Sequence, residues 1–172
     1  MNTQAAERDI TTRANVELAV RPVEQADEAL LEAFFDKVSD EDRRFRFLTA
    51  QQHVGHDQLM PMVSVDHWQT ESFLAFDKAT DELVATGMLA CDKAMEVGEI
   101  AISVRSDYRG KGLGWAMLDV LGNAAEKRGV KEVIAIEDRE NHAAIELERE
   151  KGFTPRAFEG DAHLVILAKS FA

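Results

Sequence analysis

The sequence predicts a mixed α+β fold with one central sheet, on three observations. Short runs in which apolar and polar residues alternate, as in strands, recur along the chain, and three of them follow one another between residues 71 and 106. Between other runs, apolar residues recur every three or four positions, as on amphipathic helices. The 172 residues are 45% hydrophobic and include 3 prolines, which is typical of one globular domain over residues 1–172.

A strand and a helix are predicted at the start of the chain. Residues 16–23 alternate and contain Pro22 near their end, which predicts a first strand closed by a turn. Residues 1–14 before it are expected to form a flexible lead. Residues 23–38 predict an amphipathic helix with its apolar positions at Ala26, Leu30, Leu31, Phe34, Phe35 and Val38.

Polar-rich helical segments and then a strand meander are predicted next. Residues 40–47 and 51–65 predict two further helices, and Gly55 and Pro61 interrupt the second of them. The three strands of the meander are predicted at residues 71–77, 82–92 and 96–106.

Helices and strands alternate in the last third of the chain. Residues 113–127 predict a helix with one apolar face, residues 131–137 a strand, and residues 141–151 a helix that stops at Gly152. Two closing strands are predicted at residues 154–159 and 163–170. The predicted order is therefore β-α-α-β-β-β-α-β-α-β-β.

Charge and cysteine content limit the classes of partner. The formal charge is −12, so the average field repels nucleic acid and anionic lipid and favours a basic substrate, although an acidic surface also serves solubility. Cys91 is the one cysteine, and no Cys/His cluster has metal-site spacing, so we expect neither disulfide nor metal. The sequence shows no signal peptide and no run of the ~20 apolar residues that a membrane span needs. We expect a cytoplasmic protein, and a homodimer is left open.

The chemically informative stretch is a glycine-rich turn between a predicted strand and a predicted helix. Its glycines let the backbone approach a ligand, and the helix start offers free N–H groups and a positive dipole end. Arg109 and Lys111 add charge that suits a pyrophosphate. The alternating glycines are Gly110, Gly112 and Gly114.

The spacing of these glycines excludes two familiar phosphate loops. A P-loop requires Gly-Lys-Ser/Thr, whereas Gly110-Lys111 is followed here by Gly112. The dinucleotide fingerprint requires G-x-G-x-x-G, and the turn has G-x-G-x-G. A tight strand-to-helix turn without a ligand is the alternative at this point.

The turn resembles the acyl-CoA loop of the GNAT superfamily of N-acetyltransferases, whose pattern is R/Q-x-x-G-x-G/A. Residues 109–114 (RGKGLG) match all of its positions. Residues 141–153 are similar to a second family signature, an Asn that opens a helix ending in Gly-Phe. The positions in register are Asn141, Ala144, Leu147, Gly152 and Phe153.

The predicted element order is also the order of this family, so the resemblance covers essentially the whole chain. It implies the acyl-CoA N-acyltransferase fold: α+β, with a central mixed, mostly antiparallel sheet and helices on both faces. More narrowly, SDEDRRFRF and EIAISVRSDYRGKGLG look like the acetyltransferase domain of bacterial protein lysine acetyltransferases.

The resemblance implies acetyl-CoA as co-substrate. The loop backbone would hold the CoA pyrophosphate, and the preceding strand edge would pair with the peptide-like amides of the pantetheine arm. Asn141 would reach the same arm, although Asn is also a good helix N-cap. The implied cofactor-binding residues are Ile102, Ser103, Val104, Arg109, Gly110, Lys111, Gly112, Leu113, Gly114 and Asn141.

Transfer to an alkylammonium, with a pKa near ~10.4, needs a base before nitrogen can attack the thioester. By resemblance the base is Glu99, which the apolar run beside it could bury, with a raised pKa; Glu96 is the alternative. The family often has a tyrosine after Leu147 as the acid toward the departing thiolate. Glu148 stands there instead, and either it or water would supply the proton.

The favoured function is acetyl transfer from acetyl-CoA to a protein lysine. No motif in the first two helices or the closing strands identifies the acceptor. The same chemistry on a polyamine, amino acid or aminoglycoside is therefore an alternative, and so is a non-catalytic acyl-CoA sensor.

Overall fold

The computed structural model of the protein describes residues 7–48 and 52–171. Within them, eight strands form one sheet. The strands are β1 (Arg8–Thr11), β2 (Glu17–Pro22), β3 (Thr70–Asp77), β4 (Glu82–Cys91), β5 (Val97–Val104), β6 (Glu132–Asp138), β7 (Thr154–Ala157) and β8 (Leu164–Ser170). The helices are α1 (Glu28–Phe35), α2 (Asp40–Phe47), α3 (His56–Val63), α4 (Leu113–Lys127) and α5 (His142–Glu150), with 3-10 turns η1 (Gln25–Asp27) and η2 (Ser106–Tyr108).

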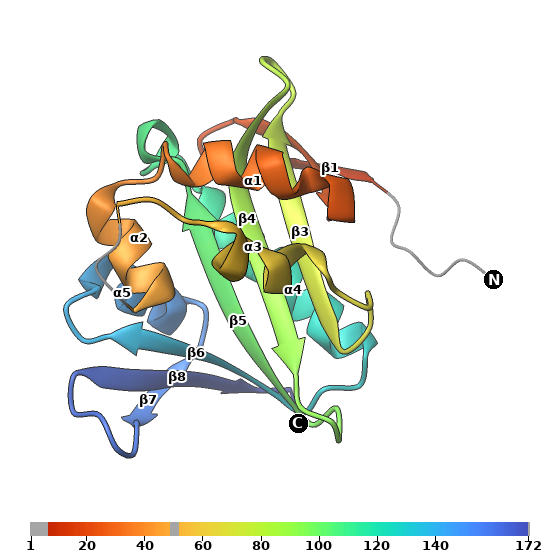
Figure 1. Ribbon diagram of the computed structural model, residues 1–172. Helices are drawn as coiled ribbons and strands as arrows, with labels where there is room; N and C mark the ends of the chain where they lie inside the picture. The colour runs from red at the N-terminus through yellow and green to blue at the C-terminus, as the bar shows by residue number, and fades with distance from the viewer. Residues whose placement is uncertain (1–6, 49–51, 172) are drawn as a thin grey trace.

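The sheet is mixed and mostly antiparallel, as the sequence predicts. Its strand order is β1-β2-β3-β4-β5-β6-β8-β7, and β5 and β6 are parallel because α4 crosses between them. In Figure 1, α1 and α3 lie in front of the sheet and α4 lies behind it. Helices therefore cover both faces, which confirms the predicted fold class.

Two apolar cores hold these layers together. Behind the sheet, α4 packs its predicted apolar face onto the strands, with Leu113, Met117 and Leu121 essentially inaccessible to solvent. In front, Leu31 and Phe35 of α1 meet α3 and the other side of the sheet. Each side chain buried in this way contributes about 1.5–3 kcal/mol to stability.

The first predicted helix presents a narrower apolar face than its pattern suggests. Leu31, Phe34 and Phe35 are buried as expected, whereas Leu30 is exposed and Ala26 falls in η1. The helix begins at Glu28. Just before it, the Asp27 carboxylate accepts two hydrogen bonds from Arg21.

Part of the predicted flexible lead is ordered. Residues 8–11 form β1, which pairs antiparallel with β2. The intervening turn is stabilised by Thr12, whose Oγ1 accepts from the N–H groups of Ala14 and Val16, and by Asn15 at a φ of 64°. Thr and Asn are turn-forming residues, so a signal for this hairpin was present in the sequence.

The predicted helix at residues 51–65 is shorter, and residue 51 lies outside the described residues. Gly55 does interrupt it, as the N-cap of α3, but Pro61 lies inside α3 without ending it. In the part of the chain that the structure describes, no helix combines the length and the apolar character needed to cross a membrane.

Candidate active site

A wedge opens in the sheet where β5 and β6 separate. The parallel register ends at Glu99↔Ile134, whereas β5 stays paired with β4 as far as Val104. Figure 1 shows the two strands adjacent near the C terminus and diverging toward α2 and α5. The β6-facing edge of residues 100–104 is therefore open, and a cavity of about 470 Å³ lies along it.

The glycine loop forms one end of this cavity. Gly110 and Gly112 have φ values of 76° and 83°, a conformation that side chains disfavour. A Cβ on Gly112 would lie 3.3 Å from the Arg13 backbone nitrogen, and one on Gly114 would lie 2.9 Å from Leu147 Cδ2. The glycines thus let the start of α4 approach both the β1–β2 turn and α5, with its N-terminal N–H groups at the cavity.

Side chains beneath and beside the loop hold it in place. The Tyr108 hydroxyl donates to Asp77 at 2.5 Å, and the Lys111 ammonium lies 5.0 Å from the Tyr108 ring centre. Arg105 is buried and donates to Asp107. These contacts occupy Lys111 and Arg105, and neither residue lines the cavity.

Two other arginines do line this end of the cavity. Arg13, in the β1–β2 turn, lies with its guanidinium carbon 4.1 Å from the Trp115 ring centre. Arg109 Nε lies 3.4 Å from an oxygen of Asp42, which links the loop to α2. Both arginines are exposed, so their charges can meet an anionic group entering from solvent.

Polar side chains along the middle of the cavity differ in whether they have a hydrogen-bond partner. The Ser103 hydroxyl is buried and has no hydrogen-bond partner among the described residues. Asn141 caps α5 by accepting from the Ala144 N–H at 3.4 Å, and it also lines the cavity. Its predicted capping role is confirmed, and a ligand contact is compatible with its position.

Carboxyl groups gather at the other end of the cavity. Glu99 lines the wall on β5 but is exposed, so the burial expected from the neighbouring apolar run does not occur. Glu148 on α5 is 6% exposed, and its Oε1 has no partner in the described part of the chain. Its carboxyl is hydrogen-bonded to that of Glu137 on β6. Burial raises the pKa of Glu148 strongly, and the Glu137 charge adds to this; burial also raises the pKa of Glu137.

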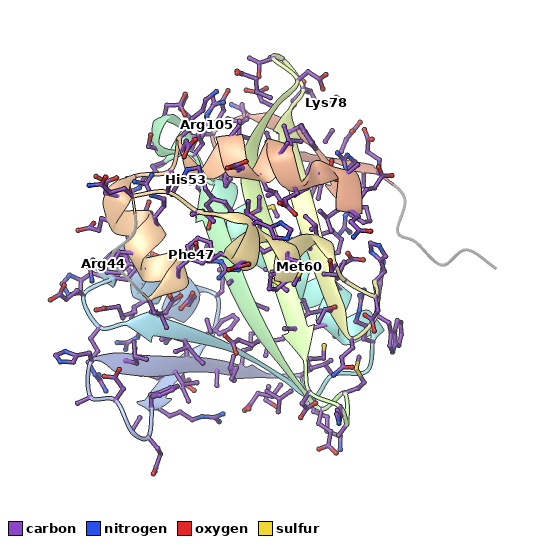
Figure 2. All side chains as sticks on the ribbon, in the orientation of Figure 1. Arg44, Phe47, His53, Met60, Lys78 and Arg105 are labelled. Carbon is purple, nitrogen blue, oxygen red and sulfur yellow. The ribbon has the colours of Figure 1, made fainter. Side chains whose placement is uncertain are left out.

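Arg46 of α2 faces this acidic group. Burial lowers the pKa of Arg46, and the Glu99 and Glu137 carboxylates partly oppose this by favouring its charged form. An arginine side chain stays protonated under such conditions, because its ordinary pKa lies far above neutral pH. Figure 2 shows that Phe47 and Arg44 lie on different sides of α2; Phe47 packs on the front core, and Arg44 lies 3.6 Å from Asp138.

Comparison with known proteins identifies the family. Residues 24–153, more than half of the chain, match the acetyltransferase (GNAT) family. The chain belongs to this family.

GNAT relatives agree with this assignment in sequence and in fold. The chain is 26% identical over 149 residues to acetyltransferase PA5475 of Pseudomonas aeruginosa, which covers 86% of this chain and 80% of that protein. The GNAT domain of S. lividans PAT superposes with a TM-score of 0.88 at 21% identity, covering 96% and 97% of the two chains. The Salmonella typhimurium protein yncA, solved with its cofactor acetyl-CoA, gives a TM-score of 0.69 at 17% identity, covering 90% and 94%.

GNAT membership confirms the predicted enzyme class, an acetyl-CoA-dependent N-acetyltransferase. The structure brings nearly all of the predicted site residues to one cavity. They are Glu99, Ile102, Ser103, Val104, Arg109, Gly110, Gly112, Leu113, Gly114, Asn141 and Glu148. Lys111 does not line it, and neither does Glu96, whose carboxylate lies 3.9 Å from the ammonium of Lys131.

The cavity residues of this GNAT chain that were missed from the sequence include Arg13, Arg46 and Glu137. Arg13 lies in the segment expected to be flexible, although the Thr12 and Asn15 turn signals were available. Arg46 and Glu137 are ordinary charged residues of a helix and a strand. Their place in the cavity depends on how α2 and β6 flank the wedge, which no local pattern encodes.

Proposed function

We propose that the chain transfers the acetyl group of acetyl-CoA to a primary amine, with a protein lysine side chain as the favoured acceptor. The observation that carries the proposal is the open edge of β5 leading directly into the glycine loop. An extended arm with peptide-like amides fits such an edge, because the strand offers backbone groups that β6 does not use.

The loop end of the cavity fits the phosphates of CoA. Gly110 and Gly112 leave space for close backbone approach, and the start of α4 supplies N–H groups and a positive dipole. Arg13 and Arg109 add charge. Ser103, whose buried hydroxyl lacks a partner among the described residues, and Asn141 would contact the pantetheine arm, together with Ile102 and Val104, while the backbone of Leu113 and Gly114 at the start of α4 would contact the phosphates.

Glu99 is the proposed general base. It lies where β5 and β6 begin to separate, and its side chain lines the same cavity as the strand edge proposed for the thioester. An exposed carboxylate can take the proton of an ammonium that arrives from solvent and pass it to water. Glu96 is disfavoured as the alternative base because its side chain is not in the cavity wall.

Two observations support a lysine acceptor. The net charge of −12 favours a basic partner, and several carboxyl groups stand at the end of the cavity that faces away from the glycine loop. The resemblance of the α2 and β5 stretches to protein lysine acetyltransferases points the same way. A small amine is the alternative acceptor.

Thiol release from acetyl-CoA tests this function, with lysine-containing proteins, polyamines, amino acids and aminoglycosides as acceptors and mass spectrometry to locate the acetyl group. Glu99→Gln is expected to lower kcat by about 10²-fold or more, and its matched control Glu96→Gln on the same segment to leave it unchanged. Full activity of Glu99→Gln would reject Glu99 as base. Binding of acetyl-CoA without transfer to any acceptor would reject the function.

A further inference from the structure

The unusual feature of the cavity is a pair of carboxyl groups in direct contact. Glu137 comes from β6 and Glu148 from α5, and their carboxyls are hydrogen-bonded to each other. Two charged carboxylates in hydrogen-bonding contact would repel each other strongly, so we expect the pair to share one proton and to carry one negative charge. Because Glu148 is 6% exposed, its carboxyl is the one that burial keeps neutral.

The proton of this pair can reach the cavity. Both residues line it, and Glu148 Oε1 has no hydrogen-bond partner in the described residues. A buried polar atom without a partner usually has a ligand, a water or a catalytic role. A neutral carboxyl can carry its proton on either oxygen, so a proton on Glu148 Oε1 can be donated to a group bound in the cavity.

The charges around the pair come from the elements packed against it. From α2, Arg46 interacts with Glu137 and with Glu99 of β5. The Arg46 guanidinium offsets the negative charge of the pair. It also donates a hydrogen bond to the Met88 sulfur at 4.0 Å.

Neighbouring charges on the same elements are already engaged. Arg44 lies 3.6 Å from Asp138 and 3.5 Å from Glu140. Asp42 is paired with Arg109. The state of the shared proton is therefore governed by burial, by the contact between the two carboxyls and by Arg46.

We propose that Glu137 and Glu148 act as one proton-donating unit for the thiol that leaves during acetyl transfer. Glu148 is the catalytic acid, and Glu137 is a positioning residue that keeps the proton on Glu148. This rests on the proposed function, and it assigns to a carboxyl pair the role that the family usually gives to a tyrosine at the position of Glu148.

The proton balance of the step closes. The ammonium gives one proton to Glu99, its nitrogen forms the C–N bond at the thioester carbonyl, and the C–S bond breaks with its electrons moving to sulfur. Glu148 donates its proton to that sulfur, and the second proton of the attacking nitrogen returns to the pair. Glu99 then releases its proton to water, so each turnover yields one amide, one thiol and one proton.

The pH dependence of kcat at saturating substrates tests the role of each member. Glu148→Gln is expected to lower kcat about 10- to 100-fold. The loss is limited because a thiolate can leave without first being protonated. Glu137→Gln removes the neighbouring charge and lets Glu148 ionise at lower pH, so the alkaline fall of kcat moves to lower pH. Glu137→Asp, which retains a carboxylate, is expected to move it back.

Exposed Glu146 on the same helix provides the matched control, and Glu146→Gln is expected to behave as the wild type. A merely structural role of Glu137 would lower kcat equally at every pH. An unmoved alkaline limb in Glu137→Gln, or full turnover in Glu148→Gln, would overturn the proposal.

Infrared spectroscopy tests the shared proton without turnover. At about pH 8 the wild type is expected to show the carbonyl band of one protonated carboxyl, absent from Glu148→Gln and weakened in Glu137→Gln. No such band in the wild type would overturn the proton-sharing pair. A band in a wild type that transfers no acetyl group would instead reject the proposed function.

Discussion

The two ends of the cavity are built from different kinds of group. At the glycine loop the structure presents backbone, shaped by the positive φ of Gly110 and Gly112 and by the start of α4. At the other end it presents side chains from four elements that are distant in the sequence. These side chains are Arg46 of α2, Glu99 of β5, Glu137 of β6 and Glu148 of α5.

This difference predicts how each end responds to change. Affinity that is spread over several backbone N–H groups survives the loss of one side chain but not a change of backbone conformation. Proton transfer depends on the protonation state of single groups and is sensitive to each of them. Substitutions at the loop should therefore alter cofactor binding, and substitutions at the acidic end should alter kcat and its pH dependence.

Gly112→Val should give the largest effect at the loop. A side chain at a φ of 83° costs about 1–2 kcal/mol, and its Cβ would meet the Arg13 backbone nitrogen. The loop must shift, and we expect acetyl-CoA binding, measured by calorimetry, to weaken about 100-fold or more. Gly160→Val is the control, since Gly160 has a φ of 96° but lies in the β7–β8 connection. Equal weakening in both variants would mean that general destabilisation is responsible.

Arg13→Ala should have a smaller effect at the same end. Its charge is exposed and one of several groups around the proposed phosphates, so we expect the KM for acetyl-CoA to rise about 5- to 10-fold with kcat unchanged. Lys111→Ala is the comparison, because Lys111 stacks on Tyr108 outside the cavity, and its KM should change less. A larger effect for Lys111→Ala would show that the loop rearranges when it binds its ligand.

Most of the fold could be predicted from the sequence because its elements are locally encoded. The α4 helix carries an apolar face every three or four residues, and those positions are the buried ones. The β1 strand was missed because four residues, two of them charged, give little apolar alternation. Pro61 was expected to interrupt a helix, yet α3 continues through it, which a local rule cannot foresee.

The residues of the candidate site likewise fall into two groups, those encoded by a local sequence pattern and those that the fold brings together. The glycine loop is one contiguous segment with a recognisable pattern, so its residues were found, except that Lys111 turns onto Tyr108. The contact between Glu137 and Glu148 joins a strand to a helix, and Arg46 comes from a third element. The likeness to the second family signature singles out Glu148, but nothing in the sequence distinguishes Glu137 among the 32 acidic residues. Their meeting depends on the separation of β5 from β6 and is visible in three dimensions alone.

The stability of the acidic end offers the last and smallest test of the comparison. Glu148 binds its proton more tightly in the folded chain than in the unfolded one, because burial and Glu137 raise its pKa. The folded state therefore holds more protons, and this group makes stability fall as pH rises above the ordinary carboxyl pKa of about 4.3. Glu148→Gln removes that penalty, and we expect it to be more stable than the wild type by about 1 kcal/mol at pH 8, or ~2–4 °C in Tm.

The gain should disappear near pH 4, where the wild-type carboxyl is neutral in both states, and exposed Glu146→Gln should show no gain at either pH. A Glu148→Gln variant that is less stable at pH 8 would mean that Glu148 is held there as a stabilising carboxylate, and would leave the pair without a proton to give.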